Sequence, residues 1–258
     1  MTPFILFTLG LSLTLNASEP KRIVSLSPTA TEILFEMGVG ALVVGTAEAS
    51  DYPPEARGIE RVGPYHQPNK EKLVRLKPDL VIIFREGMDQ IRPFLRRARI
   101  QFLELEGRRL GDYENLVATL GKTLGREEKA TRMIGEWKKE WSRIEQPREK
   151  KGAALVLETN PLTLAGRETF LSDIIERCGH RNAFANFGGY PQVSRERFLI
   201  QKGLDLIVLI SADQLQGRTI FEQIKKPTIK VSPSDFSILG PRLPSLARDL
   251  CQKIRAAT

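Results

Sequence analysis

The same short pattern occurs twice in the chain, and each copy leads into an apolar run. Residues 69–74 (NKEKLV) precede the run 79–82 (DLVI), and residues 194–199 (SRERFL) precede the run 205–208 (DLIV). Each copy has the order polar, basic, Glu, basic, apolar, apolar, then a turn, an Asp and a buried strand. Helix–turn–strand units also recur by chance in α/β proteins. A repeated supersecondary unit nevertheless favours a fold of two similar halves.

Short β-branched runs alternate with helical patterns in both halves. In the first half we expect strands at residues 22–26, 43–45, 80–84 and 100–105. The run 80–84 (LVIIF) is unbroken and apolar, which is typical of a strand buried in a parallel sheet. Strands that alternate with helices predict an α/β fold.

One long helical pattern, residues 126–146, lies between the two halves. Its apolar side chains repeat on one helical face, and Pro147 with the charged run 148–151 ends it. Such a helix spans about 30 Å and makes a stiff connector. We therefore predict an N-terminal α/β lobe at 18–125, a connecting helix at 126–147 and a C-terminal α/β lobe at 148–258.

The first seventeen residues carry no charge and include an apolar run from Phe4 to Leu15. This run is shorter than the ~20 residues that a membrane-spanning helix needs. It is typical of a secretory signal, with the small residues Ala17 and Ser18 at the cleavage point. A buried N-terminal strand is the alternative. We predict a signal peptide at 1–17 and, because no Cys follows it, an exported protein without a lipid anchor.

Export changes the interpretation of the two cysteines, Cys178 and Cys251. They lie 73 residues apart, which is too far for a compact zinc motif. In an oxidising compartment an isolated pair is a candidate disulfide. We expect this disulfide to join the C-terminal helix to the rest of the second half. Two buried thiols remain the alternative.

Composition and charge exclude several classes of protein. Hydrophobic residues make up 41% and charged residues 27%, which excludes a disordered chain, a collagen-like repeat and a polytopic membrane protein. The net charge is +8, and Arg92, Arg96, Arg97 and Arg99 cluster on one expected helix. No nucleic-acid recognition motif accompanies them. We therefore interpret the positive charge as a solvated surface and expect no nucleic-acid partner.

Catalytic and nucleotide-binding motifs fail on inspection. The sequence at 121–123 (GKT) resembles the end of a phosphate loop, but Leu116 replaces that motif's first glycine. A dinucleotide fingerprint begins at Gly38 and fails at Val43, and no Gly-x-Ser-x-Gly elbow occurs. The two histidines, His66 and His180, are 114 residues apart. We expect neither an enzyme nor a resident metal or cofactor.

Several stretches carry a resemblance to a known family. They are residues 22–28 (RIVSLSP), 50–54 (SDYPP), 76–82 (LKPDLVI), 191–196 (PQVSRE), 234–236 (SDF), 241–242 (PR) and Cys251. With them the chain resembles the cobalamin (vitamin B12)-binding proteins of bacterial ABC importers. These belong to a class of periplasmic binding proteins that also carries haem and iron–siderophores. The resemblance covers nearly all of the mature chain.

The resemblance implies a periplasmic protein, a monomer, with two α/β lobes joined by a rigid helix. It also implies a cleft between the lobes that holds cobalamin or a related corrinoid, and delivery of that ligand to the membrane subunits of an ABC importer. The ligand-binding positions carried over from the family are Ala49, Tyr65, Phe84, Tyr190, Asp235, Phe236, Ser237, Ile238 and Leu239.

The chain departs from the family pattern at two of its aromatic positions. Ala49 stands where the family has a tyrosine, and Leu162 lies where it has a phenylalanine. The remaining aromatics are smaller than the family's tryptophans, so the resemblance implies a roomier cleft or one shaped for a related corrinoid. Ordinary core packing is the alternative for the aromatics, above all for Phe84 at the end of a buried strand.

The repeat and the resemblance both single out Glu71 and Glu196. In the family, one glutamate of each lobe meets arginines of the importer's membrane subunits. The alternative is local, because a carboxylate early in a helix is stabilised by the helix dipole without any partner.

Two other functions remain open at this stage. A haem-binding protein of the same class could use Tyr65 and His66 as iron ligands, and a siderophore-binding protein would favour arginines in the cleft. An exported α/β enzyme would need an acid, base or nucleophile that the sequence does not reveal.

Overall fold

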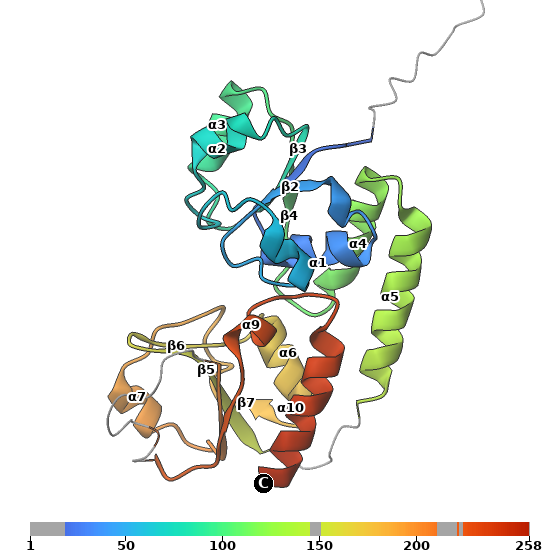
Figure 1. The fold of residues 1–258 in the computed structure, drawn as a ribbon. Coiled ribbons are helices and arrows are strands. Elements are labelled where there is room, and N and C mark those ends of the chain that lie inside the picture. Colours follow the sequence, from blue (N-terminus) through green and yellow to red (C-terminus); the bar gives the residue numbers. More distant parts are fainter. Residues whose placement is uncertain (1–18, 145–150, 211–220, 222–223, 258) are drawn as a thin grey trace, which may run out of the picture.

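Two α/β lobes, one above the other in Figure 1, make up the protein. The structure is a computed structural model, and it describes residues 19–144, 151–210, 221 and 224–257. The expected signal peptide and the last residues of the expected connecting helix lie outside this described part. Two α/β units with a helix between them confirm the predicted fold class.

The first lobe is built on a four-stranded sheet of order β2-β1-β3-β4, in which all neighbouring strands are parallel. The central strand β3 is buried over its first four residues, as its unbroken apolar sequence predicts. The strands are β1 (Ile23–Ser25), β2 (Val43–Thr46), β3 (Leu80–Phe84) and β4 (Phe102–Leu105). The helices are α1 (Pro28–Glu36), η1 (Gly40–Leu42), η2 (Pro54–Gly58), α2 (Lys70–Arg75), α3 (Ile91–Arg97) and α4 (Asp112–Thr123).

The second lobe has a mixed sheet of order β6-β5-β8-β9, and β7 also pairs with β5. Among the described strands of this sheet, β6 alone runs antiparallel to its neighbour. The strands are β5 (Gly152–Thr159), β6 (Leu162–Leu164), β7 (Arg181–Asn182), β8 (Leu206–Leu209) and β9 (Thr228–Lys230). The helices are α6 (Phe170–Arg177), α7 (Arg195–Leu199), α9 (Pro233–Phe236) and α10 (Leu243–Ala257).

Helix α5 (Glu127–Ser142) leads from the first lobe to the second along one side of the molecule (Figure 1). It buries the face that carries Ala130, Met133, Trp137 and Trp141, as the helical spacing predicts. Trp137 stacks on Tyr113 of α4 with ring centroids 4.3 Å apart. The connecting helix therefore packs along its length against the hydrophobic core of the protein.

The two lobes share one hydrophobic core. A single cluster contains Ile23 and Ile82 of the first sheet, Leu155 and Val208 of the second, and residues of α5 and α10. Ionic contacts reinforce this connection, since Arg242 pairs with Glu32 and Arg248 with Glu140. A continuous core resists rotation of one lobe against the other, because such motion would open voids in close-packed side chains.

The disulfide between Cys178 and Cys251 is formed, with 4.9 Å between the Cα atoms. Cys178 is the residue that ends α6, and Cys251 lies in α10. The bond thus ties the C-terminal helix to the second lobe, as predicted, and the alternative of two buried thiols is wrong.

Within the described part of the chain, no helix has the length and apolar character needed to cross a membrane.

Candidate ligand cleft and docking surfaces

The first lobe places charged side chains where two neighbouring strands end. Strands β3 and β4 are parallel with Phe84 opposite Leu105, so the residues that follow them meet at one edge of the sheet. Arg85 pairs there with Glu106 at 2.8 Å, and Arg108 pairs with Glu86. Ligands of open α/β sheets bind at this carboxyl edge. Each guanidinium here is matched by a carboxylate.

Two exposed tyrosines, one from each lobe, are the prominent aromatic side chains near this edge. Tyr65, on the loop between β2 and α2, is 47% exposed, and Tyr190, on the loop after β7, is 46% exposed. Gly87, just after β3, adjoins Tyr65, because a Cβ atom there would lie 3.6 Å from the ring. Tyr113, in contrast, is 1% exposed and belongs to the core.

Tyr190 belongs to the second lobe, but charged residues of the first lobe lie close enough to affect it. The pKa of Tyr190 is raised to about 12, first by burial and then by the negative charge of Glu86, while Arg108 acts in the opposite direction. The ring is half accessible, yet protein atoms around the hydroxyl remove part of its hydration. Because Glu86 and Arg108 follow β3 and β4, Tyr190 faces the carboxyl edge of the first sheet.

The other positions expected from the first lobe differ in exposure. Ala49, in the loop after β2, is exposed. Phe84 is half-buried and packs against the shared core, so core packing accounts for part of its surface. Leu162, the second departure from the family pattern, is 4% exposed and belongs to the core of the second lobe.

The segment 235–239 varies in exposure from residue to residue. Phe236 and Leu239 were expected against the ligand, but both are 3% exposed and lie in the core that the lobes share. Core packing, the alternative for the aromatic side chains, therefore competes with ligand contact at Phe236. Asp235 is half-buried and pairs with Arg242 at 3.1 Å, whereas Ser237 is exposed and Ile238 half-buried. The segment packs at the junction between the lobes.

The expected docking residues occupy equivalent places. Glu71 lies in the first turn of α2 and Glu196 in the first turn of α7, and both are exposed. Each helix is capped in the same way, because the side chains of Asn69 and Ser194 accept backbone N–H groups of the first turn. The pKa of Glu196 is lowered by its own backbone N–H group and by the Ser194 hydroxyl. Both helices lie on the side away from α5 (Figure 1).

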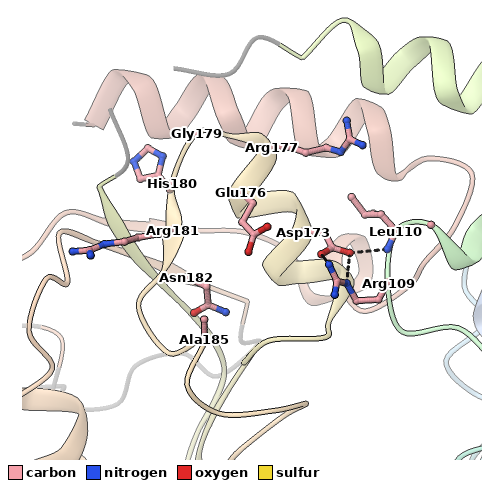
Figure 2. A pocket seen from close by; sticks show the side chains of 11 residues that line it. Arg109, Leu110, Asp173, Glu176, Arg177, Gly179, His180, Arg181, Asn182 and Ala185 are labelled. Carbon is pink, nitrogen blue, oxygen red and sulfur yellow. Dashed lines mark hydrogen bonds and ion pairs between the residues drawn. The ribbon is translucent and has the colours of Figure 1, made fainter. Parts of the chain in front are cut away.

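A pocket of about 690 Å³ lies elsewhere, where the loop after β4 meets α6 and β7 (Figure 2). Arg109 donates from Nε to Asp173 at 2.8 Å, and the backbone N–H of Leu110 donates to the same carboxylate. Arg177 lies over the Trp141 ring at 5.3 Å. Arg109 and Arg177, which line this pocket, therefore already have partners within the protein. The pocket lies at the junction between the two lobes.

No group of three or more His, Cys, Asp or Glu side chains placed to hold a metal ion occurs among the described residues. His66 is exposed and makes an edge contact with Tyr65, with ring centroids 5.1 Å apart.

Comparison with known proteins agrees with this architecture. A family profile described as "Periplasmic binding protein" matches residues 23–227. The chain belongs to the periplasmic binding protein family. The family predicted from the sequence motifs is thus confirmed.

Relatives of this periplasmic binding protein span nearly its whole length. A "Vitamin B12-binding protein" of Pectobacterium carotovorum is 32% identical, covering 92% of this chain and 89% of the relative. The crystal structure of the vitamin B12 binding protein BtuF of Vibrio cholerae has a TM-score of 0.76 at 23% identity, covering 92% and 98% of the two chains. The haem-binding protein RhuT of Roseiflexus sp. RS-1 has a TM-score of 0.79 at 22% identity, covering 92% and 98%. These solved structures share the fold.

The sequence analysis of this binding protein missed a buried ionic cluster between the lobes. Glu32 of α1 is 2% exposed at its side chain and pairs with Arg242 at 2.8 Å. The Arg242 guanidinium lies over the Tyr52 ring, 4.0 Å from its centroid. Burial raises the pKa of Glu32, and the hydrogen bond and charge of Arg242 lower it in part. The sequence offered one sign of this cluster: Glu32 is a charged residue among the apolar and small residues of the buried face of α1.

Proposed function

We propose that this protein captures cobalamin, or a related corrinoid, between its lobes in the periplasm and delivers it to the membrane subunits of an ABC importer. The full-length similarity to curated vitamin B12-binding proteins carries the proposal. Export through the signal peptide 1–17 and action as a monomer are parts of it.

Aromatic side chains on both walls suit a large, flat macrocycle. Tyr65, Phe84 and Tyr190 offer broad faces whose ordering costs little conformational entropy. Ala49 is exposed as well, and its small side chain leaves room that a larger one would fill. We propose these four positions, with Asp235, Ser237 and Ile238 at the junction, as the surroundings of the ligand.

The charged side chains at the carboxyl edge of the first sheet are paired with one another. This pairing favours a ligand whose rim carries no excess charge. The pairs Arg85–Glu106 and Arg108–Glu86 leave no unmatched guanidinium among these four residues. The amide groups on the rim of a corrin hydrogen-bond with either partner of such a pair. The carboxylates of haem or the anionic groups of a ferric siderophore complex would instead need unpaired arginines.

Titration with cyanocobalamin tests the ligand. We expect saturable one-to-one binding by calorimetry, with recovery of the corrinoid unchanged, as for a carrier that performs no chemistry. Haemin, titrated under the same conditions, is the control. Binding of haemin and not of cyanocobalamin would overturn the proposal.

Haem is the second candidate, because several solved structures of the same fold are haem-binding proteins and because Tyr65 adjoins His66. Iron ligation by this pair predicts a Soret band that changes in His66→Ala and Tyr65→Phe. A Soret spectrum identical in the wild type and both variants would reject this ligation.

Delivery is tested at the two glutamates. Glu71→Lys with Glu196→Lys should leave cobalamin affinity in solution unchanged, because neither carboxylate is proposed to touch the ligand. Docking to a cobalamin importer in nanodiscs and uptake into vesicles should fall, since each substitution replaces attraction to an arginine with repulsion. Normal docking by the double variant would make these glutamates favourable helix-start residues only.

A further inference from the structure

Helices α2 and α7 share a second feature besides the glutamate: each has an exposed apolar side chain. Val74 is 52% exposed and Leu199 is 42% exposed, although both are large apolar residues. Each follows its glutamate by three residues and occupies the same position of the internal repeat. Residues three apart on a helix lie on one face, so each glutamate has an apolar neighbour beside it.

The inner side of each helix fixes this orientation. The residue just before each exposed apolar side chain, Leu73 in α2 and Phe198 in α7, is 0% exposed. Phe198 stacks on Phe184 with ring centroids 5.4 Å apart. Rotation that would bury Val74 or Leu199 would therefore move a buried apolar side chain of the core into water, which is unfavourable.

Of the four basic residues that flank the glutamates, Lys70, Lys72 and Arg197 contact their own lobes, whereas the positive charge of Arg195 acts on Glu196 and helps to lower its pKa. The Lys72 ammonium donates to the backbone carbonyl of Arg61 at 2.9 Å, and Lys70 lies over the Phe94 ring at 5.6 Å. Arg197 lies over the Phe187 ring at 5.9 Å. Among the described residues neither glutamate has an ion-pair partner. Each lobe thus presents an exposed carboxylate next to an exposed apolar side chain, and in the second lobe the exposed Arg195 lies next to Glu196 in the sequence.

We propose that Glu71 with Val74, and Glu196 with Leu199, form two equivalent docking stations for the importer's membrane subunits. Each station fits a cationic side chain set beside an apolar hollow. The inference rests on the proposed function, and it adds the apolar half of the contact. Two like stations on duplicated lobes suit a partner that presents the same surface twice, as two copies of one chain do.

Ile200 supplies a matched control next to one station. It is 68% exposed and follows Leu199 directly. The same repeat position in the first lobe holds Arg75, which pairs with Glu60 and has no apolar character. Ile200 therefore lies outside the repeated station, despite its greater exposure.

The experiment measures binding of the cobalamin-loaded protein to a cobalamin ABC importer in nanodiscs. Three variants are compared with the wild type: Val74→Thr with Leu199→Asn, Glu71→Ala with Glu196→Ala, and Ile200→Asn. We expect the apolar pair of substitutions to weaken docking about five- to tenfold for each residue. The glutamate pair should also weaken it, and Ile200→Asn should change it less than twofold.

Ionic strength separates the two kinds of contact. Salt screens exposed charges, so the deficit of the glutamate variant should shrink between about 0.05 and 0.5 M salt. The deficit of the apolar variant should persist. Cobalamin affinity and thermal stability should match the wild type in all variants, because every substituted side chain is exposed.

Each result decides between the inference and the function beneath it. Weak docking by the glutamate variant with normal docking by the apolar variant overturns the inference and leaves the proposed function. A loss of docking in Ile200→Asn as large as that in Val74→Thr with Leu199→Asn overturns the repeated station. An importer that binds the wild type and all variants alike, or none of them, overturns the proposed docking and the inference together.

Discussion

At the scale of single residues, Tyr190 relates the second lobe to the carboxyl edge of the first sheet. It belongs to the second lobe, yet Glu86 and Arg108 of the first lobe influence its pKa. A side chain that is half accessible and surrounded by both lobes is well placed to touch a ligand held between them. Its energetic importance then depends on the ring face and not on the hydroxyl.

Replacing Tyr190 tests this position. Tyr190→Ala should weaken cobalamin binding by about 1–3 kcal/mol, as for other aromatic anchors, with the fold intact. Tyr190→Phe keeps the ring and should bind nearly as the wild type does. Calorimetric titration gives the dissociation constants, and circular dichroism checks the fold. Unchanged affinity in Tyr190→Ala would place the ligand elsewhere.

Phe236 should respond in the opposite way. Because its ring is 3% exposed in the shared core, Phe236→Ala should lower the free energy of unfolding by about 3–5 kcal/mol. Urea denaturation measures this loss. A variant with unchanged stability and lost cobalamin affinity would restore Phe236 to the cleft.

The contrast between these two residues shows what the sequence can predict about the site. Tyr65 and Tyr190 follow Pro64 and Gly189, and such loop positions favour exposure over core packing. Phe236 also follows a polar loop, but it is buried in a cluster that includes residues of the first lobe such as Ile33, far away in the sequence. Such contacts have no local pattern. The same limit concealed the pairing of Glu32 with Arg242.

At the scale of elements, local pattern was sufficient for the regular parts of the fold. The unbroken run 80–84 became β3, and the helical spacing after residue 126 became α5. Short strands such as β6 and β9 were missed, because three residues carry little periodic signal, whereas β1, equally short, lies within the predicted β-branched run 22–26. Their pairing is decided by the sheet that they extend.

The disulfide between α6 and α10 allows a test at this scale. It closes a loop of 73 residues, so the chain-entropy relation gives about 4 kcal/mol of stabilisation. Reduction, or Cys178→Ala with Cys251→Ala, should lower the urea midpoint accordingly. Thiol titration of the unfolded, unreduced protein should find no reactive thiol, and two reactive thiols would contradict the bond. Cobalamin affinity of the reduced, folded protein should remain unchanged.

At the scale of the whole molecule, the shared core and the ionic cluster of Glu32, Asp235 and Arg242 hold the lobes in one arrangement. The guanidinium of Arg242 also lies over Tyr52, so one side chain connects three segments of the chain. In the docking that we propose, lobes with a fixed spacing would hold Glu71 and Glu196 at a constant separation. The cluster should therefore affect stability and docking together.

Removing Arg242 should have an effect that depends on pH. The raised pKa of Glu32 means that this group stabilises the fold most below its ordinary value of 4.5, and that the contribution is lost as pH rises through the folded-state pKa. Without Arg242, which lowers that pKa, the loss with rising pH becomes larger. Arg242→Ala should thus cost roughly 2–3 kcal/mol near pH 7, less than a fully buried pair because its side chain keeps 21% exposure.

The cost should diminish towards pH 4, where Glu32 is protonated in the variant. Urea denaturation at several pH values measures it, and Glu32→Gln with Arg242→Ala is the control, since no buried charge is then left unpaired. The difference between the single and double variants isolates Glu32 from Asp235, which also pairs with Arg242. A loss that is equal at pH 4 and pH 7 would show that packing of Arg242 on Tyr52, and not the buried charge, joins the lobes.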